Sequence, residues 1–518
     1  MAMWLRTIQD KNAGGDACAP MSGIEVILEG RMRFLVRGFF VIGCFLLVCG
    51  GSQAQSAKSK KTSSSVIKET DLYIEARSWF RKGEAMIGTD KENSEEQVEM
   101  FRKAVEIRPE FLEAHYNLGL LYLNQNKSKD AAAEFETVLR LEPNSDPDIY
   151  YLLSSAYRQS GNFDSAVTAM ETGLEKKPKD MVMLKALAYL QFHTNRDEAA
   201  VATLQRILEL NPDDTASRIE LALIYQKKND SENAAAEYQE VLRGDPANFS
   251  ARYNLGLIYL RQRKMAEALA ELESAAAINP NNVELLVTLG DVQTHLKRYG
   301  KAAATYQSAL EKAGDPKMLL PKLGFSLAND RKIPEAIAAL EKAVSLDALN
   351  ADAFFLLGDL YVDSGKIDDA IVAYKKSIEI RSGQKEVLLN LGVLYAGKEM
   401  YSEALAELRQ AVALDPDYVS AWSNIAIVAE KLKLEQDAIA AYEKTIAFGK
   451  GKAFHYFRLG ALYAKNDKPE LAIDAFAKAI EMEPEKYRPI LKEELKNVHS
   501  DLDGIRFKKR FTDLLTPQ

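Results

Sequence analysis

Cysteine and histidine are scarce in this sequence. Its 518 residues include three cysteines, Cys18, Cys44 and Cys49, all near the N-terminus, and five histidines at widely separated positions. It contains no His-Glu-x-x-His pair, no Gly-x-Ser-x-Gly turn and no Gly-x-x-x-x-Gly-Lys-Ser/Thr loop. Such a chain offers no disulfide framework and none of the common arrangements for metal, phosphate or nucleophilic chemistry. We therefore predict no catalytic residues, no metal site, no cofactor and no enzymatic activity.

An excess of basic charge is absent as well. Lysine and arginine number 67 and aspartate and glutamate number 75, so that the net charge is -8 at pH 7. This balance gives no electrostatic reason to expect a nucleic-acid partner, and no small-molecule substrate is expected either. The mean hydropathy of -0.23 excludes a polytopic membrane protein. What remains, with 47% hydrophobic and 27% charged residues, is an ordinary globular composition.

One short apolar run stands out near the N-terminus. Arg33 and Arg37 precede the apolar stretch 39–49, which is followed by small and polar residues ending at Ala54. A basic region, an apolar stretch and a small-x-small close are typical of a secretory signal peptide. We predict a signal peptide over residues 1–54, with Met32 as the true start, and export to the periplasm or cell envelope.

Two alternatives to cleavage stay open. The sequence Val41-Ile42-Gly43-Cys44 resembles a lipobox, which would make the protein a lipoprotein anchored at Cys44. The segment could also remain as an uncleaved anchor, although a spanning helix needs about 20 apolar residues. Membrane contact is expected only through this segment. The serine- and lysine-rich residues 55–70 are interpreted as a flexible linker.

From about residue 71 a single pattern of 34 residues takes over. A small residue recurs at Gly83, Gly119, Ser154, Ala188, Ala222, Gly256, Gly290, Gly324, Gly358, Gly392, Ala426 and Gly460, with a spacing of 34 from Ser154 onward. A second column, closely following the first, reads Gln97, Ala131, Ala166, Ala200, Ala234, Ala268, Ala302, Ala336, Ala370, Ala404, Ala438 and Ala472. The regularity predicts an array of twelve units in place of several globular domains.

Each unit carries the signals of a helical hairpin. Two stretches with an apolar period near 3.6 flank a short polar segment such as residues 261–264, which predicts helix, turn and helix. The small columns are expected where the two helices cross. Larger residues are expected to fill the core, and a proline such as Pro280 ends the second helix because it cannot continue it. Since no unit can bury both faces alone, neighbouring units must stack.

The combination Leu-Gly-x-x-Tyr, Ala-x-x-x-Phe/Tyr/Leu-x-x-Ala and a closing proline resembles the tetratricopeptide repeat (TPR) family, in a form exported by bacteria. The resemblance implies an all-α, right-handed α-solenoid of about twelve units over residues 71–485. Residues 486–518 are predicted to form a C-terminal capping helix and tail, because Leu491, Leu495, Val498 and Leu502 fall at helical spacing.

The resemblance also implies an inner groove, lined mainly by the first helix of each unit, that binds peptides or protein segments. An aromatic column on that helix supplies the candidates Tyr116, Tyr151, Tyr253, Phe355 and Phe457. The position that carries asparagine in peptide-binding relatives supplies Asn117, Asn254, Asn390 and Asn424, and Arg458 completes the set. The alternative for the aromatic residues is packing between neighbouring first helices, and for the asparagines it is bridging between neighbouring helices.

These observations predict a non-enzymatic scaffold that binds other proteins or extended peptides at the cell envelope. Two further functions remain open. The protein could belong to an assembly machine for pili, outer-membrane proteins or polysaccharide export. It could also be an accessory subunit that presents substrates to a separate envelope enzyme.

Overall fold

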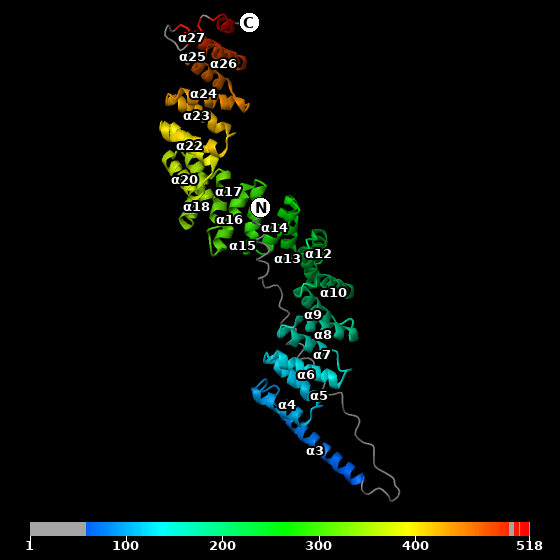
Figure 1. Cartoon of the computed structure of the whole chain (residues 1–518). Coiled ribbons are helices and arrows are strands. Elements are labelled where there is room, and N and C mark those ends of the chain that lie inside the picture. The colour runs from blue at the N-terminus through cyan, green and yellow to red at the C-terminus, as the bar shows by residue number, and fades with distance from the viewer. Residues whose placement is uncertain (1–57, 497–501, 507, 517–518) are drawn as a thin grey trace. The chain divides into compact units, whose positions relative to one another are not determined.

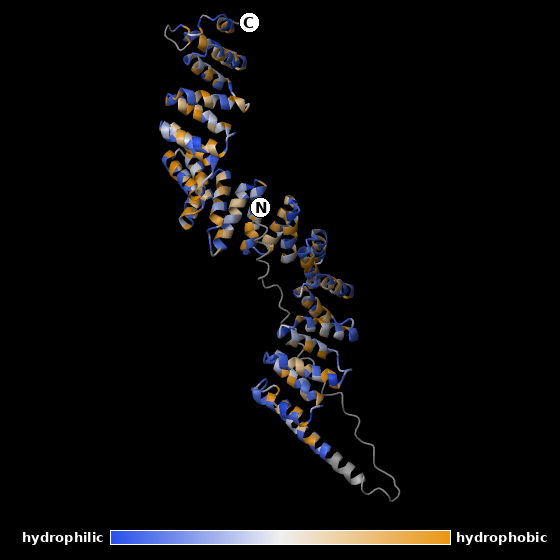
Figure 2. Ribbon diagram, viewed as in Figure 1, coloured by the Kyte–Doolittle hydropathy of each residue, from blue (hydrophilic) through white to orange (hydrophobic). Residues whose placement is uncertain are grey.

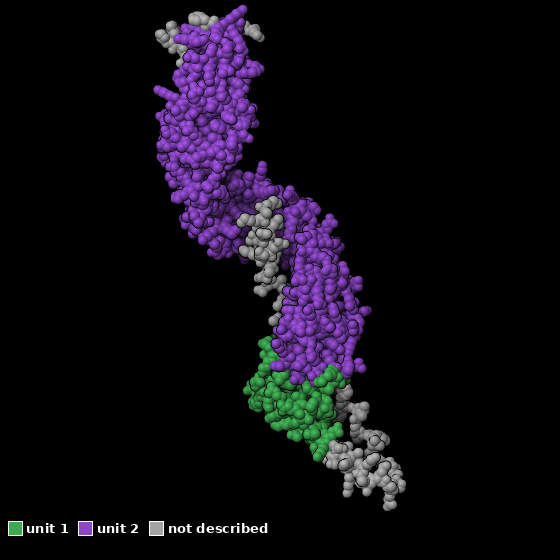
Figure 3. Space-filling model, in the orientation of Figure 1, with its two compact units in different colours: residues 1–127, 140–142 green, residues 128–139, 143–518 purple. Residues whose placement is uncertain are grey.

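The computed structural model describes residues 58–496, 502–506 and 508–516, and in these ranges it contains helices and no strand (Figure 1). The predicted signal peptide, its start at Met32 and the alternative lipid site at Cys44 lie outside the described residues. The chain divides into two compact units, residues 1–127 with 140–142 and residues 128–139 with 143–518 (Figure 3). The prediction of an all-α protein is confirmed.

Twelve consecutive helix pairs make up most of the described chain, and we number these repeats 1 to 12. The first helices are α3 (Lys58–Glu84), α5 (Leu112–Asn124), α7 (Asp148–Gln159), α9 (Met181–His193), α11 (Thr215–Lys227), α13 (Phe249–Arg261), α15 (Val283–His295), α17 (Leu319–Asn329), α19 (Ala351–Asp363), α21 (Lys385–Gly397), α23 (Val419–Lys431) and α25 (Ala453–Lys465). The second helices are α4 (Glu95–Ile107), α6 (Ser128–Leu141), α8 (Phe163–Lys176), α10 (Asp197–Leu210), α12 (Ser231–Gly244), α14 (Met265–Ile278), α16 (Tyr299–Lys312), α18 (Ile333–Leu346), α20 (Ile367–Ile380), α22 (Tyr401–Leu414), α24 (Glu435–Ala447) and α26 (Pro469–Met482). Two helices follow, α27 (Pro484–Glu494) and α28 (Lys509–Leu515).

From α8 to α24 each second helix packs against its own first helix and against the next one, which is the arrangement of an α-solenoid. The glycines of the small column lie where the two helices of a repeat cross, as at Gly256, Gly324 and Gly392. Every alanine of the second column, from Ala131 to Ala472, is fully buried. At Gly358 an added Cβ would stand 2.3 Å from the Tyr374 ring, so only a hydrogen fits there. Figure 2 shows the resulting alternation of apolar and polar residues along the helices.

The turn inside each hairpin has a feature that the polar residues did not predict. From repeat 2 to repeat 12, the residue seven positions after the small column has a positive φ, between 53° and 80°. Glycine fills this place only in repeats 3 and 9, at Gly161 and Gly365. Elsewhere it is Asn126, Asn195, Asn229, Arg263, Lys297, Arg331, Glu399, Lys433 and Asp467. A left-handed arginine, lysine or glutamate is unfavourable, so the packed helices impose this turn.

The smaller compact unit contains the least regular repeat. Gln97 stands where the other repeats have alanine, and its side chain is buried. Its Nε2 donates to the Gly83 carbonyl at 3.0 Å. Its Oε1 accepts from the Asn93 backbone at 2.8 Å. Phe80 packs against Phe101, with ring centroids 5.4 Å apart. Both hydrogen-bonding ends of the glutamine are therefore satisfied in a position that otherwise tolerates only a methyl group.

The structure differs from the predicted linker at residues 55–70. Helix α3 begins at Lys58, so most of that segment is the start of the first helix. Serine and lysine suggested a linker because neither residue marks an apolar face. The propensity of lysine for helix is nevertheless close to that of leucine, and the segment continues without a turn signal into the helix of repeat 1.

The predicted capping helix is interrupted. Helix α27 ends at Glu494, and Leu502 lies in a turn, so one helix does not run from Leu491 to Leu502. Val498 and Phe507 lie outside the described residues. The chain returns to α26, where Phe511 is fully buried and its ring lies 5.8 Å from that of Phe476. A continuous helix rising about 1.5 Å per residue would have carried Phe511 away from this contact.

Candidate functional site

One face of the first helices is open to the solvent in several repeats. Positions -6, -3, +1 and +4, counted from the small column, follow at intervals of three or four residues and so share one side of the helix. We call it the first-helix face. Large apolar side chains at its positions -6 and +1 are 37% to 77% exposed: Val182, Met318, Phe325, Val393, Ile427 and Phe454. These residues share one register in repeats 4, 8, 10, 11 and 12, and contiguous exposed apolar surface is the usual mark of an interaction site.

The aromatic candidates at position -3 lie deeper than these residues. Tyr151, Tyr253, Phe355 and Phe457 are half-buried and pack against the hydrophobic core of their neighbours. Phe457 lies between α26 and α27, with its ring 5.8 Å from Phe476 and 4.9 Å from Tyr487. The structure thus places these rings between helices.

Tyr253 has polar contacts as well as apolar ones. Its ring stacks on Phe249 at 5.9 Å. Burial raises the pKa of its hydroxyl well above the ordinary range, and the nearby Glu284 raises it further, while Thr288 lowers it. Glu284 and Thr288 belong to the next first helix, so the tyrosine links repeats 6 and 7. Tyr116 of the smaller unit occupies the same register and is also half-buried.

The asparagine candidates at position -2 have different hydrogen-bond partners. The side chains of Asn254 and Asn424 donate to carbonyls of their own helices, at Ser250 (2.9 Å) and Ser420 (2.8 Å). Asn390 instead reaches the preceding repeat. Its Nδ2 lies 3.3 Å from the Tyr374 hydroxyl and 3.4 Å from Asp359 Oδ1. Asn117 is half-buried in α5. The structure therefore does not bring these four amides into one ladder.

Arg458 is held by an ion pair. Its Nη2 lies 2.5 Å from Glu430 Oε1 and its Nε 3.0 Å from Glu430 Oε2. The same carboxylate accepts from the Tyr442 hydroxyl at 2.6 Å. The bond to Glu430 raises the pKa of the guanidinium. Arg458 therefore joins repeats 11 and 12, and its charge is already neutralised.

This arrangement recurs and defines a type of site that sequence reasoning missed. Tyr238, Tyr306, Tyr374 and Tyr442 stand 68 residues apart, with leucine in the intervening repeats. Each ring is buried and each hydroxyl bonds to a residue of its own first helix. The acceptors are Gln226 (3.1 Å), Asp291 (2.6 Å), Asp359 (2.5 Å) and Glu430 (2.6 Å). We call each such tyrosine, with its acceptor and the position -2 residue of the next repeat, a tyrosine node.

A signal for the nodes exists in the sequence. The alternation of tyrosine and leucine at a period of two repeats is visible in the second helices from residue 238 onward. Aspartate at position +1 alternates in the same way, at Asp291 and Asp359. What the spacing could not supply is the direction of each hydroxyl.

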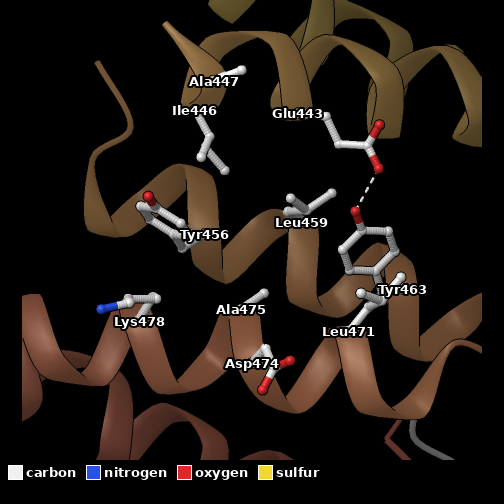
Figure 4. A pocket seen from close by; sticks show the side chains of 10 residues that line it. All are labelled: Glu443, Ile446, Ala447, Tyr456, Leu459, Tyr463, Leu471, Asp474, Ala475 and Lys478. Atoms are coloured by element: carbon white, nitrogen blue, oxygen red, sulfur yellow. Dashed lines mark hydrogen bonds between the residues drawn. The ribbon is translucent and has the colours of Figure 1, made fainter. Parts of the chain in front are cut away.

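A shallow apolar hollow lies between α24, α25 and α26 (Figure 4). Ile446, Tyr456, Leu459 and Leu471 form most of its wall, and the Tyr463 hydroxyl donates to Glu443 at one end. Two charged side chains at its rim already have ion-pair partners, Asp474 with Arg510 and Lys478 with Glu481. The hollow presents aliphatic surface and no convergent set of titratable groups, so it lacks the features of a catalytic centre.

Among the described residues, no group of three or more histidine, cysteine, aspartate or glutamate side chains could hold a metal ion. The buried His455 contacts the Ser423 hydroxyl at 2.9 Å, and burial lowers its pKa. None of the described helices has both the length and the apolar character required to cross a membrane.

The fold and the register define a helical-hairpin solenoid, and the family follows from direct comparison. Models described as tetratricopeptide repeat or TPR repeat match residues 76–111, 112–145, 157–220, 219–283, 259–320, 358–399, 389–453 and 456–486. The matches extend over nearly all of the twelve repeats. The chain belongs to the tetratricopeptide repeat family.

Other comparisons are less informative. No relative is found among curated proteins. A solved structure of Naa15/Naa10 bound to HypK-THB is 17% identical, with 78% of this chain and 68% of that chain covered and a TM-score of 0.36. A tetratricopeptide repeat protein from Parabacteroides merdae is 16% identical, with 48% and 99% covered and a TM-score of 0.33. YrrB, described as having an unusual peptide-binding site, is 23% identical, with 42% and 95% covered and a TM-score of 0.25.

Proposed function

We propose that this protein is a non-enzymatic scaffold that binds segments of other proteins on its first-helix face and works at the cell envelope after export. The main observation that supports this proposal is the set of exposed apolar residues at positions -6 and +1 of the first helices. These side chains lie on regular, rigid helices, and apolar groups in a fixed register are suited to an extended or helical segment of a partner.

Membership of the tetratricopeptide repeat family supports the scaffold function. Repeat solenoids present extended concave surfaces that they use for binding. Several charged side chains of this array form ion pairs between neighbouring repeats, such as Lys227 with Asp197 at 2.8 Å and Lys465 with Glu435 at 2.7 Å. Binding through apolar contacts and hydrogen bonds fits such a surface better than catalysis does.

Export is supported by the sequence of residues 32–54 alone. We propose cleavage after Ala54, which leaves a mature chain without cysteine. Cell fractionation followed by mass spectrometry of the mature N-terminus tests this. A mature chain starting at Gln55 in the envelope fraction is the expected result. A lipid on Cys44 would replace cleavage by lipidation, and any peptide from residues 1–31 would contradict the start at Met32.

The scaffold function is tested by photocrosslinking from two valines. p-Benzoylphenylalanine replaces Val393, which is 43% exposed on the first-helix face of α21, or Val372, which is 61% exposed on the second helix α20. Irradiation in the native host is expected to give discrete protein adducts from position 393 and none from position 372. Equal adducts at both positions, or none at position 393, would refute binding on this face. Recovery of one stoichiometric enzyme as the adduct would favour the accessory-subunit function.

A further inference from the structure

The four tyrosine nodes differ in how their charge is balanced. In repeat 5 the acceptor is the neutral Gln226. In repeat 7 the acceptor is Asp291, and Lys322 from position -2 of the next repeat forms an ion pair with it. In repeat 11 the acceptor is Glu430, and Arg458 from the same position pairs with it at 2.5 Å. Each of these three nodes is therefore electrically neutral.

The node of repeat 9 is the exception. Asp359 accepts from Tyr374 at 2.5 Å, but position -2 of the next repeat is Asn390, which brings an amide and no charge. The groups that influence the Asp359 carboxyl in the described chain include no cation. Burial raises its pKa, the Tyr374 bond lowers it, Asp363 raises it and Asn390 lowers it. Asp359 is thus a half-buried carboxylate that lacks the counter-charge present at both equivalent carboxylates.

Exposed apolar residues occupy the position of Asp359 in the two flanking first helices. Position +1 of the flanking first helices is Phe325 in α17 and Val393 in α21, and each is 43% exposed. Asp363 adds a second negative charge one turn further along α19. A carboxylate between exposed apolar side chains matches a basic side chain, whose aliphatic stem packs on apolar surface while its charged end reaches the carboxylate.

We propose that Asp359 is the subsite for an arginine or lysine of the bound partner, which supplies from outside the cation that Lys322 and Arg458 supply from within. The apolar residues next to that cation in the partner pack on Phe325 and Val393. The proposal rests on the scaffold function and specifies its partner as a segment in which basic and apolar side chains alternate. Bidentate geometry at a carboxylate favours arginine over lysine.

A pair of synthetic peptides tests the subsite. One is a fluorescein-labelled nonapeptide in which arginine alternates with valine, and the other carries citrulline, a neutral isostere, in place of each arginine. Fluorescence anisotropy with the full-length mature chain measures the two dissociation constants. The wild type is expected to bind the arginine peptide at least tenfold more tightly. Two variants are expected to reduce this ratio to below twofold: Asp359→Asn, which removes the charge, and Asn390→Lys, which builds in the cation of repeat 7.

Controls separate loss of the subsite from loss of folding. Asp369→Asn changes the net charge equally but lies on the second helix α20, so it should keep the tenfold preference. Asn390→Lys should melt at or above the wild-type temperature, because it completes an ion pair that repeat 7 already forms. An equal affinity of the wild type for both peptides, or a preference retained in Asp359→Asn, would overturn the proposal. Adducts at position 393 that persist in Asp359→Asn would overturn it too, while leaving the scaffold function intact.

Discussion

Repeats 7 and 9 can be compared with repeats 5 and 11. All four contain a buried tyrosine, but the small-column residue that its ring faces differs by one methyl group. The small-column residue is Gly290 or Gly358 in the first pair and Ala222 or Ala426 in the second. At the two glycines the tyrosine ring lies so close that an added Cβ would meet it at 2.5 Å and 2.3 Å. With alanine the ring cannot take that place.

The hydroxyl follows the ring. Where the small-column residue is glycine, the hydroxyl bonds to the aspartate at position +1, and in repeat 7 it also lies 3.5 Å from the Thr294 hydroxyl at position +4. Where that residue is alanine, the hydroxyl bonds to position +4, which is Gln226 or Glu430. The two positions lie one helical turn apart. In these four nodes the small-column residue and the position of the acceptor change together, and position +1 next to the two alanines is Leu223 or Ile427, whose side chains have no acceptor.

The substitution Gly358→Ala is expected to have the largest effect on stability among the changes to these four repeats. The new methyl group would collide with Tyr374 and displace its hydroxyl from Asp359, and position +4 of this repeat is Val362, which cannot accept a hydrogen bond. We expect the free energy of unfolding to fall by about 3 kcal/mol, from overpacking and a lost bond to a charged group. Chemical denaturation measures it.

Adding Val362→Gln to Gly358→Ala should restore about half of this loss, because the double variant has the alanine and the position +4 acceptor of repeat 5. Val362→Gln alone serves as the matched control. A Gly358→Ala variant as stable as the wild type would show that the ring position does not depend on the glycine.

Removing a hydroxyl is expected to cost less. Tyr374→Phe leaves the half-buried Asp359 without its shortest hydrogen bond, which should lower the unfolding free energy by about 2 kcal/mol. Tyr238→Phe removes a bond to the neutral Gln226 and should cost about 1 kcal/mol. Thermal and denaturant unfolding of the two variants side by side would show the difference. Equal losses would mean that the charge of the acceptor is unimportant.

The charge of Asp359 also predicts a dependence on pH. Its folded-state pKa lies above the ordinary value of 3.8, chiefly because of burial. The folded chain thus keeps this proton where the unfolded chain has lost it, so this carboxyl's contribution to stability falls as the pH rises from 3.8 through the folded-state pKa. Asp359→Asn lacks this effect. Its stability relative to the wild type should increase across that range and then level off, and a constant difference from pH 3.8 to 7 would contradict the raised pKa.

The smallest expected effects distinguish two asparagines. Asn390→Ala removes an amide that bridges repeats 9 and 10 and should cost about 1 kcal/mol. Asn424→Ala removes only a bond to its own helix at Ser420 and should change stability by less than about 0.5 kcal/mol. Melting temperatures of both variants measure this. A larger loss for Asn424→Ala would reverse the assignment of the bridging role.

The sequence predicted the fold well because the fold depends on a few steric rules that repeat. Small residues at a spacing of 34 from Ser154 onward located the helix crossings of repeats 3 to 12, and the alanine column is buried throughout. The two errors fall where repetition stops. Residues 58–70 have no apolar periodicity to show that they are helical, and the chain after Glu494 turns back because Phe511 is buried against α26, a long-range contact invisible to local spacing.

The candidate site was less accessible to sequence reasoning. The position -3 aromatics were found by register, but register does not tell whether a ring such as that of Phe457 points into the core or the solvent. The nodes depend on differences of about an ångström between a methyl group and a tyrosine ring, as at Gly358. Such differences are visible only in the three-dimensional structure, although the alternation of tyrosine and leucine marks the repeats in which the nodes lie.

The period of 68 residues has an evolutionary consequence. Inserting a single 34-residue repeat after residue 238 would place two tyrosines or two leucines in succession and would separate a carboxylate such as Asp291 from Lys322 in the following repeat. Inserting or deleting a pair preserves the alternation of tyrosine and leucine. Genes for such arrays therefore lengthen and shorten most easily by duplication or loss of two hairpins at a time.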